Sequence, residues 1–153
     1  MSVKRIDPDR AHELLESEQG FVYVDVRTES EFEECHIPEA KNVPYMVRGP
    51  GGIGLSLNRN FIQDVSGRFD QGDKLIIGCA KGGRSMKASE MLAEAGFRNI
   101  YDMRGGIIGE TDPFGNVTFP GWSSRGLPTV SPQGVAQPVG LSGARGIVGR
   151  GVR

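Results

Sequence analysis

The chain has 153 residues, of which 37% are hydrophobic and 24% are charged, and its formal net charge at pH 7 is -1. This length and composition predict one soluble globular domain. The near-neutral charge offers no basic surface for nucleic acid or for an anionic membrane. No stretch of about 18 consecutive apolar residues occurs, so no membrane-spanning helix is expected.

The first part of the chain predicts a helix followed by a strand. Asp7 is a suitable N-cap and Pro8 a suitable first helical residue, so a helix is expected to begin there and to end by Gly20. The β-branched run over residues 21–26 then predicts a strand that is buried on both faces.

A second helix is predicted to begin directly after this strand. Thr28 and Glu31 have the spacing of a capping box, and Pro38 limits the helix that follows. Residues 40–43 are a short strand candidate. Residues 44–60 contain four glycines and are predicted to form a long loop.

The pattern of helix and strand continues in the second half. Apolar residues at helical spacing over 61–69 predict a third helix, and residues 74–78 predict a buried strand. Ser85 is predicted as the N-cap of a fourth helix that ends at Gly96. Residues 99–103 then predict a further strand.

This alternation predicts an α/β domain with a mostly parallel central sheet of about four to five strands and helices on both faces. The domain is expected to occupy residues 1–128. Residues 129–153 contain no aromatic or acidic residue and six glycines, so they are predicted to be a Gly/Pro-rich disordered tail. Ligands bind at the carboxyl ends of parallel strands, and Cys79 lies at such an end because it follows the predicted strand 74–78.

The segment after that strand has the composition of an anion-binding loop. Gly82 and Gly83 allow the backbone to curl, so that amide groups point inward near the positive end of a helix. Lys81 and Arg84 add two cations. Such surroundings lower the pKa of a cysteine from about 8.5 by a unit or more. The pattern therefore predicts a thiolate at Cys79 that attacks an anionic sulfur donor and carries the sulfur as a persulfide.

Metal binding is not expected, because the only histidines, His12 and His36, lie outside any zinc-ligand spacing. No cofactor is predicted either. The two cysteines, Cys35 and Cys79, are too few for a disulfide-stabilised scaffold.

Several segments together resemble one protein family. Residues 79–84 read C-x-x-G-x-R, residues 24–44 contain a second signature, and Gly96-Phe97 and Gly105-Gly106 follow in order. Over about residues 4–128 the chain resembles the rhodanese-like domain family, most closely its single-domain sulfurtransferases of plants and algae. The resemblance implies a thiosulfate sulfurtransferase that accepts sulfur from thiosulfate and passes it to cyanide or to a thiol such as glutathione or thioredoxin.

The resemblance also assigns roles to residues. It implies that Cys79 is the nucleophile and that the persulfide cradle is formed by Ala80, Lys81, Gly82, Gly83, Arg84 and Ser85. Asp25, Arg27 and His36 are interpreted as structural supports near the site.

The chain departs from the family pattern in two places. Cys35 stands where the family usually has glycine. It is interpreted as a buried spectator thiol, and the alternative is that it resolves the Cys79 persulfide as a disulfide. Residues 107–121 separate the double glycine from Trp122 and are interpreted as an insertion that could alter acceptor access. Trp122 itself is expected in the core.

Two alternative functions remain open. The first is an arsenate reductase or a phosphatase-like enzyme, since both attack oxyanions with a thiolate. Phosphatase loops read C-x5-R, whereas four residues separate Cys79 from Arg84, and the shorter loop favours sulfur. The second is a non-catalytic binding module, which the presence of Cys79 disfavours.

The expected partners are a small anionic sulfur donor and a thiol acceptor, and the chain is expected to be a monomer. Residues 1–10 show neither an apolar segment nor an Arg/Ser-rich pattern, so the sequence as given predicts a cytoplasmic location. A plastid or a mitochondrion is the alternative if a targeting segment has been removed.

Overall fold

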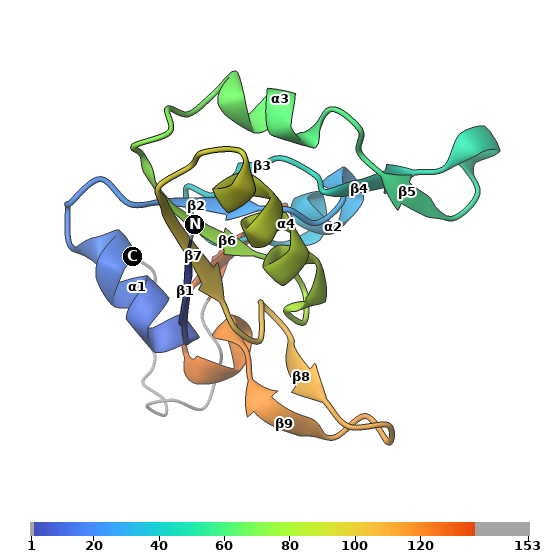
Figure 1. The fold of residues 1–153 in the computed structure, drawn as a ribbon. Helices are drawn as coiled ribbons and strands as arrows, with labels where there is room; N and C mark the ends of the chain where they lie inside the picture. Colours follow the sequence, from blue (N-terminus) through green and yellow to red (C-terminus); the bar gives the residue numbers. More distant parts are fainter. Residues whose placement is uncertain (1, 137–153) are drawn as a thin grey trace.

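A five-stranded sheet organises residues 2–136, which are the residues that the computed structural model describes (Figure 1). The strand order is β1-β7-β6-β2-β3, and each neighbouring pair is parallel. The strands are β1 (Val3–Ile6), β2 (Val22–Asp25), β3 (Lys41–Asn42), β6 (Lys74–Gly78) and β7 (Asn99–Met103). The predicted α/β class with a mostly parallel sheet is confirmed.

Four α-helices accompany the sheet in this part of the chain: α1 (Pro8–Glu16), α2 (Glu29–Glu34), α3 (Phe61–Ser66) and α4 (Gly83–Glu94). The Asp7 carboxylate caps α1 by accepting a hydrogen bond from the Arg10 amide. The capping box of Thr28 and Glu31 is formed at the start of α2. These two predicted helix starts are therefore confirmed, although α1 ends before Gly20.

Buried side chains cover both faces of the sheet. On one face Val24 and Ile77 pack with residues of α3 and α4, and on the other Tyr23 and Ile76 pack with residues of α1. Because neighbouring residues of β2 and β6 point to opposite faces and all but the first residue of each strand are buried, these central strands are mostly apolar. Figure 1 shows α1 apart from α3 and α4, on the other side of the sheet.

The structure corrects two predictions about the first half. Strand β1 was not predicted, because it pairs only with β7 at the edge of the sheet and carries two charged residues between its apolar ends. The segment 44–60, predicted as a loop, contains the antiparallel pair β4 (Met46–Arg48) and β5 (Leu55–Leu57), joined through a 3-10 turn, η1 (Pro50–Gly52). Strands of three residues are too short to give a recognisable pattern.

The segment 107–121 also forms a hairpin, made of β8 (Gly109–Thr111) and β9 (Val117–Pro120). It leads into a second 3-10 helix, η2 (Trp122–Arg125), whose Trp122 is buried as expected. Both hairpins project from the body of the domain (Figure 1).

Residues 129–136 belong to the segment that the sequence predicts to be disordered, and the structure gives them regular backbone pairing. They form the hairpin of β10 (Thr129–Ser131) and β11 (Gly134–Ala136). The backbone of His36 exchanges two hydrogen bonds with that of Val130, at 2.8 and 2.7 Å, so a distant segment orders this one. The rest of the predicted tail, 137–153, lies outside the described residues. None of the helices between residues 2 and 136 is long and apolar enough to cross a membrane.

Candidate active site

Cys79 lies at the carboxyl edge of the sheet, directly after β6 and between the ends of β2 and β7. Its side chain is 1% exposed and packs in the core cluster that also holds Ala88 of α4. This is the edge of a parallel sheet at which ligands bind, as the sequence predicted for this residue.

Two backbone amides donate hydrogen bonds to the sulfur of Cys79. The Gly82 amide lies 3.1 Å and the Ser85 amide 3.3 Å from Sγ. Gly82 adopts φ 110°, a left-handed conformation that favours glycine, and it is the N-cap of α4. The prediction that Ser85 is the N-cap is therefore wrong, because Gly82 starts the helix earlier. The sulfur lies at the N-terminus of a 12-residue helix, whose dipole favours negative charge there.

The double glycine after β7 holds the backbone of the same loop. The Ile107 amide donates to the Cys79 carbonyl at 2.9 Å, and the Ile108 amide donates to the Ala80 carbonyl at 2.8 Å. A Cβ atom on Gly106 would lie 2.3 Å from the Cys79 carbonyl oxygen, and the φ of Gly106 is 62°. Only glycine allows this approach, so Gly106 belongs to the site although it is distant in sequence.

Arg84 is paired with Glu31 of α2. Its two terminal nitrogens donate to the two carboxylate oxygens of Glu31 at 2.8 and 3.0 Å. The hydrogen bonds from Arg84 lower the pKa of Glu31 from 4.5 to about 2, although partial burial opposes the shift. The sequence identified Glu31 only as part of a capping box, and the structure adds that it fastens the end of the active-site loop to α2.

Lys81 and Gly83 contribute less to the surroundings of the sulfur. Lys81 is exposed, and its ammonium lies 3.4 Å from the Thr111 hydroxyl of β8. Gly83 has open space around its Cα. Of the six residues predicted for the cradle, Gly82 and Ser85 therefore donate to the sulfur, and Arg84 forms an ion pair instead.

A buried acid that the sequence reasoning missed lies beneath the loop. Asp102 of β7 is 0% exposed and accepts a hydrogen bond of 2.6 Å from the Ser85 hydroxyl and one of 3.2 Å from Nε of Arg5. Burial raises the pKa of Asp102, and the hydrogen bonds from Ser85 and Arg5 oppose this shift. An acidic residue just before the double glycine was the available signal.

Asp25 and Arg27 form a buried ion pair beside the site. Arg27 donates from Nε and from a terminal nitrogen to the Asp25 carboxylate, with the shortest distance 2.7 Å. Burial alone would lower the pKa of Arg27. The hydrogen bonds and charge of the Asp25 carboxylate outweigh this effect, so the pKa of Arg27 is raised and the guanidinium stays charged. Arg27 also donates to the Cys35 carbonyl, and Asn42 donates to the carbonyls of Asp25 and Arg27. These bonds join the ends of β2, α2 and β3.

Cys35 and His36 directly follow α2, and the His36 side chain packs back against that helix. The His36 ring stacks on Phe32 with 3.9 Å between centroids, and its Nδ1 lies 2.9 Å from the Phe32 carbonyl. Cys35 is half-buried, and neither it nor Cys79 is in a disulfide. Within the described part of the chain, no group of three or more histidine, cysteine or acidic residues is arranged to hold a metal.

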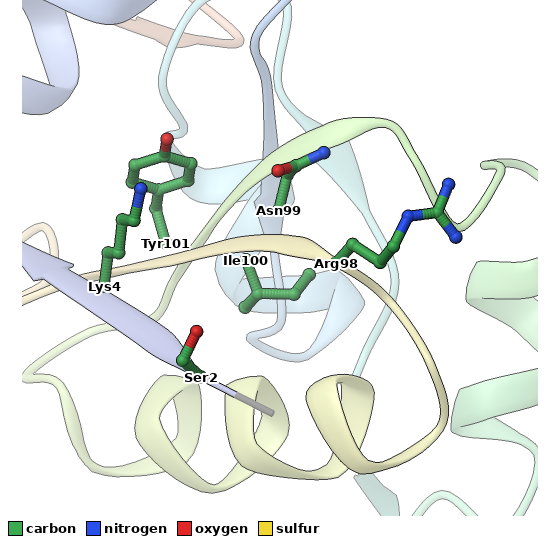
Figure 2. Close-up of a pocket in the computed structure, with 6 residues that line it drawn as sticks. All are labelled: Ser2, Lys4, Arg98, Asn99, Ile100 and Tyr101. Carbon is green, nitrogen blue, oxygen red and sulfur yellow. The ribbon is translucent and has the colours of Figure 1, made fainter.

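A small pocket elsewhere on the molecule is shown in Figure 2. It is lined by Ser2, Lys4, Arg98, Asn99, Ile100 and Tyr101. Residues 99–101 begin β7, whereas Cys79 follows the end of the parallel strand β6. The pocket therefore lies at the opposite edge of the sheet from Cys79 and is separate from the candidate active site.

Comparisons with known proteins agree on the kind of domain. A model of the rhodanese-like domain matches residues 7–109. The chain is 43% identical over 119 residues to thiosulfate sulfurtransferase 16, chloroplastic, of Arabidopsis thaliana, an alignment that covers 78% of this chain and 86% of that protein. It is 36% identical over 93 residues to Protein HIGH ARSENIC CONTENT 1, mitochondrial, of the same plant, with 61% of this chain and 54% of that protein covered. The crystal structure of Rv0390 from M. tuberculosis superposes with a TM-score of 0.69 at 29% identity, covering 84% of this chain and 98% of that one.

Proposed function

This chain belongs to the rhodanese-like domain family, and we propose that it is a sulfurtransferase in which Cys79 carries the transferred sulfur as a persulfide. One observation carries the proposal: two amides donate to the sulfur of Cys79 at the N-terminus of α4. Amide donors and a helix N-terminus stabilise a negative charge on sulfur. They suit a reaction in which Cys79 attacks as a thiolate in the first half-reaction and leaves as a thiolate in the second.

In the first half-reaction, we propose thiosulfate as the donor. The Cys79 thiolate attacks the outer sulfur of thiosulfate, a sulfur–sulfur bond forms, and the bond to the sulfonate sulfur breaks. Sulfite leaves with the bonding electron pair, and the persulfide keeps one negative charge, so no proton is required. The Gly82 and Ser85 amides donate to Sγ of Cys79, which carries the negative charge before the attack; in the persulfide this charge moves to the adjacent outer sulfur.

In the second half-reaction, an anionic acceptor attacks the outer sulfur of the persulfide. Cyanide gives thiocyanate and a thiolate gives a new persulfide, and in both cases Cys79 leaves as a thiolate with the electron pair. The resulting ping-pong cycle returns the enzyme to its starting state. The side chain of Cys79 is 1% exposed, which limits hydrolysis of the persulfide by water.

Arg84 and Lys81 have different roles in this proposal. Arg84 holds the loop in place through its two hydrogen bonds to Glu31. Lys81 is an exposed residue of the loop, so its charge attracts an anionic donor from solution.

Arsenate reduction is the second candidate, because one relative carries a name that refers to arsenic. The geometry weighs against it. A tetrahedral oxyanion would need the guanidinium of the loop as a ligand, and both terminal nitrogens of Arg84 donate to Glu31. We therefore prefer sulfur transfer.

The test is intact-protein mass spectrometry after incubation with thiosulfate. We expect a mass gain of one sulfur atom that a small thiol removes, that Cys79→Ser abolishes and that Cys35→Ser retains. Absence of an adduct with every sulfur donor, together with turnover of arsenate, would replace this proposal by the second candidate. Absence of both would leave a non-catalytic binding module.

A further inference from the structure

A chain of buried polar groups connects the active-site loop to the edge strand of the sheet. The Ser85 hydroxyl donates to Asp102 at 2.6 Å, and Asp102 accepts from Arg5 of β1 at 3.2 Å. Ser85 and Asp102 are 0% exposed, whereas the Arg5 side chain is 45% exposed and reaches solvent. The reaction described above uses none of these side chains.

Ser85 links this chain of groups to both amides that bind the sulfur. Its own amide is one donor to Cys79, at 3.3 Å. Its hydroxyl also lies 3.3 Å from the carbonyl oxygen of Gly82, the residue that supplies the other donor. Holding the Ser85 side chain therefore fixes the positions of both donors relative to the sulfur.

The carboxylate of Asp102 has an energetic cost. Burial of a carboxylate opposes its charged form, which is the main reason for the raised pKa of Asp102. Replacing a buried ion pair by apolar residues of similar size is often neutral or stabilising for a fold. A carboxylate in this position is therefore better explained by what it holds than by stability.

Ser89 supplies an internal comparison on the same helix. It lies one turn beyond Ser85 and is also 0% exposed, yet its hydroxyl has no hydrogen-bond partner among residues 2–136. The interface between α4 and the sheet therefore accepts a serine without an anchor. The anchor at Ser85 coincides with the amide that contacts the sulfur.

We propose that Ser85 and Asp102 are positioning residues that hold the Gly82 and Ser85 amides on the sulfur of Cys79. Arg5 keeps the Asp102 carboxylate in place as the hydrogen-bond acceptor. The inference rests on the proposed function for its effect on turnover. It makes a separate claim about the sulfur itself, which can be measured without any sulfur transfer.

The test compares Ser85→Ala with Ser89→Ala, which removes a buried hydroxyl from the same helix without breaking an anchor. We expect Ser85→Ala to slow persulfide formation on the order of 10-fold to 100-fold, because small displacements of reacting groups have effects of that size. KM for thiosulfate is expected to stay unchanged, because the hydrogen bond between Ser85 and Asp102 acts on the sulfur of Cys79 and not on the binding of thiosulfate. Ser89→Ala should form the persulfide at the wild-type rate. Ser85→Thr keeps a hydroxyl at this position and should also be faster than Ser85→Ala.

A second pair of variants tests the acceptor. Asp102→Asn keeps an oxygen that accepts from Ser85, whereas Asp102→Leu fills a similar volume without one. We expect Asp102→Leu to lose the rate as Ser85→Ala does and Asp102→Asn to retain most of it. If Ser85→Ala does not fold, this pair decides the question, and equal rates for the two would overturn the inference.

Alkylation of Cys79 by iodoacetamide at neutral pH separates the two proposals. Ser85→Ala should slow alkylation several-fold relative to the wild type and to Ser89→Ala, whether or not the protein transfers sulfur. Equal alkylation rates in the three proteins would refute the positioning role. A wild type that alkylates fast but forms no sulfur adduct would refute the proposed function alone.

Discussion

Substitution of Gly106 by alanine tests how closely the double glycine holds the active-site loop. The new Cβ would lie 2.3 Å from the carbonyl oxygen of Cys79 and 2.5 Å from that of Ala80. These contacts are backbone atoms, so a change of side-chain rotamer cannot relieve them. The loop that carries Cys79 must shift, and its hydrogen bonds from Ile107 and Ile108 must lengthen.

The expected loss of stability has two parts. Alanine in the left-handed conformation of Gly106, at φ 62°, costs about 1–2 kcal/mol. Overlap with a packed backbone adds about 1–3 kcal/mol. We therefore expect Gly106→Ala to lower the free energy of unfolding by about 2–5 kcal/mol and to reduce formation of the sulfur adduct at Cys79 at least tenfold.

Gly115→Ala is the matched control. Gly115 lies in the β8–β9 hairpin with φ 87°, and a Cβ there would meet no atom within 4 Å. It should lose only about 1–2 kcal/mol and keep its activity. Urea unfolding gives the two free energies and mass spectrometry gives the adduct. Equal losses in the two variants, or full activity in Gly106→Ala, would refute the argument from close approach.

Three further predictions concern charge and burial. Because Arg84 lowers the pKa of Glu31 from 4.5 to about 2, the pair stabilises the fold above about pH 4.5 and loses this contribution as the pH falls through about 2. Glu31→Gln should flatten that part of the curve of unfolding free energy against pH, and the exposed Glu33→Gln should not. Tyr23→Phe should lower the free energy of unfolding by less than about 1 kcal/mol or raise it, because the buried hydroxyl has no hydrogen-bond partner within residues 2–136. A loss above about 2 kcal/mol in thermal or urea unfolding would contradict this. Lys81→Ala should lower kcat/KM for thiosulfate a few-fold at low salt, and an effect that persists at high salt would exclude attraction at a distance.

Local patterns in the sequence predicted the part of the fold that depends on neighbouring residues. The strand 74–78 has the predicted bounds because it is buried on both faces and needs an apolar run. The caps at Asp7 and Thr28 were predicted because each acts within one turn of its own helix. Gly96 follows the end of α4, as predicted, and adopts a positive φ. The Phe97 amide donates a hydrogen bond to the Leu92 carbonyl in the last turn of the helix.

Contacts between distant residues were not predictable from one sequence. Glu31 and Arg84 are 53 positions apart, and nothing in the capping box indicates that its acid also binds an arginine. The start of α4 depended on the left-handed conformation of Gly82, and a serine at position 85 gave the wrong cap because its hydroxyl binds Asp102 instead. The role of each of these side chains depends on a partner that only the folded protein brings near.

The ordered hairpin at residues 129–136 has the same explanation. Its composition is that of a disordered segment, and its order comes from backbone pairing between Val130 and His36. The sequence around Val130 carries no sign of that partner.

The most direct test of sulfur transfer through Cys79 is a crystal structure of the protein after treatment with thiosulfate. We expect electron density for a second sulfur bonded to Sγ of Cys79, within hydrogen-bond distance of amides in the 79–85 loop. An unmodified Cys79 with the second sulfur on Cys35, or a bound sulfur that faces away from those amides, would contradict it.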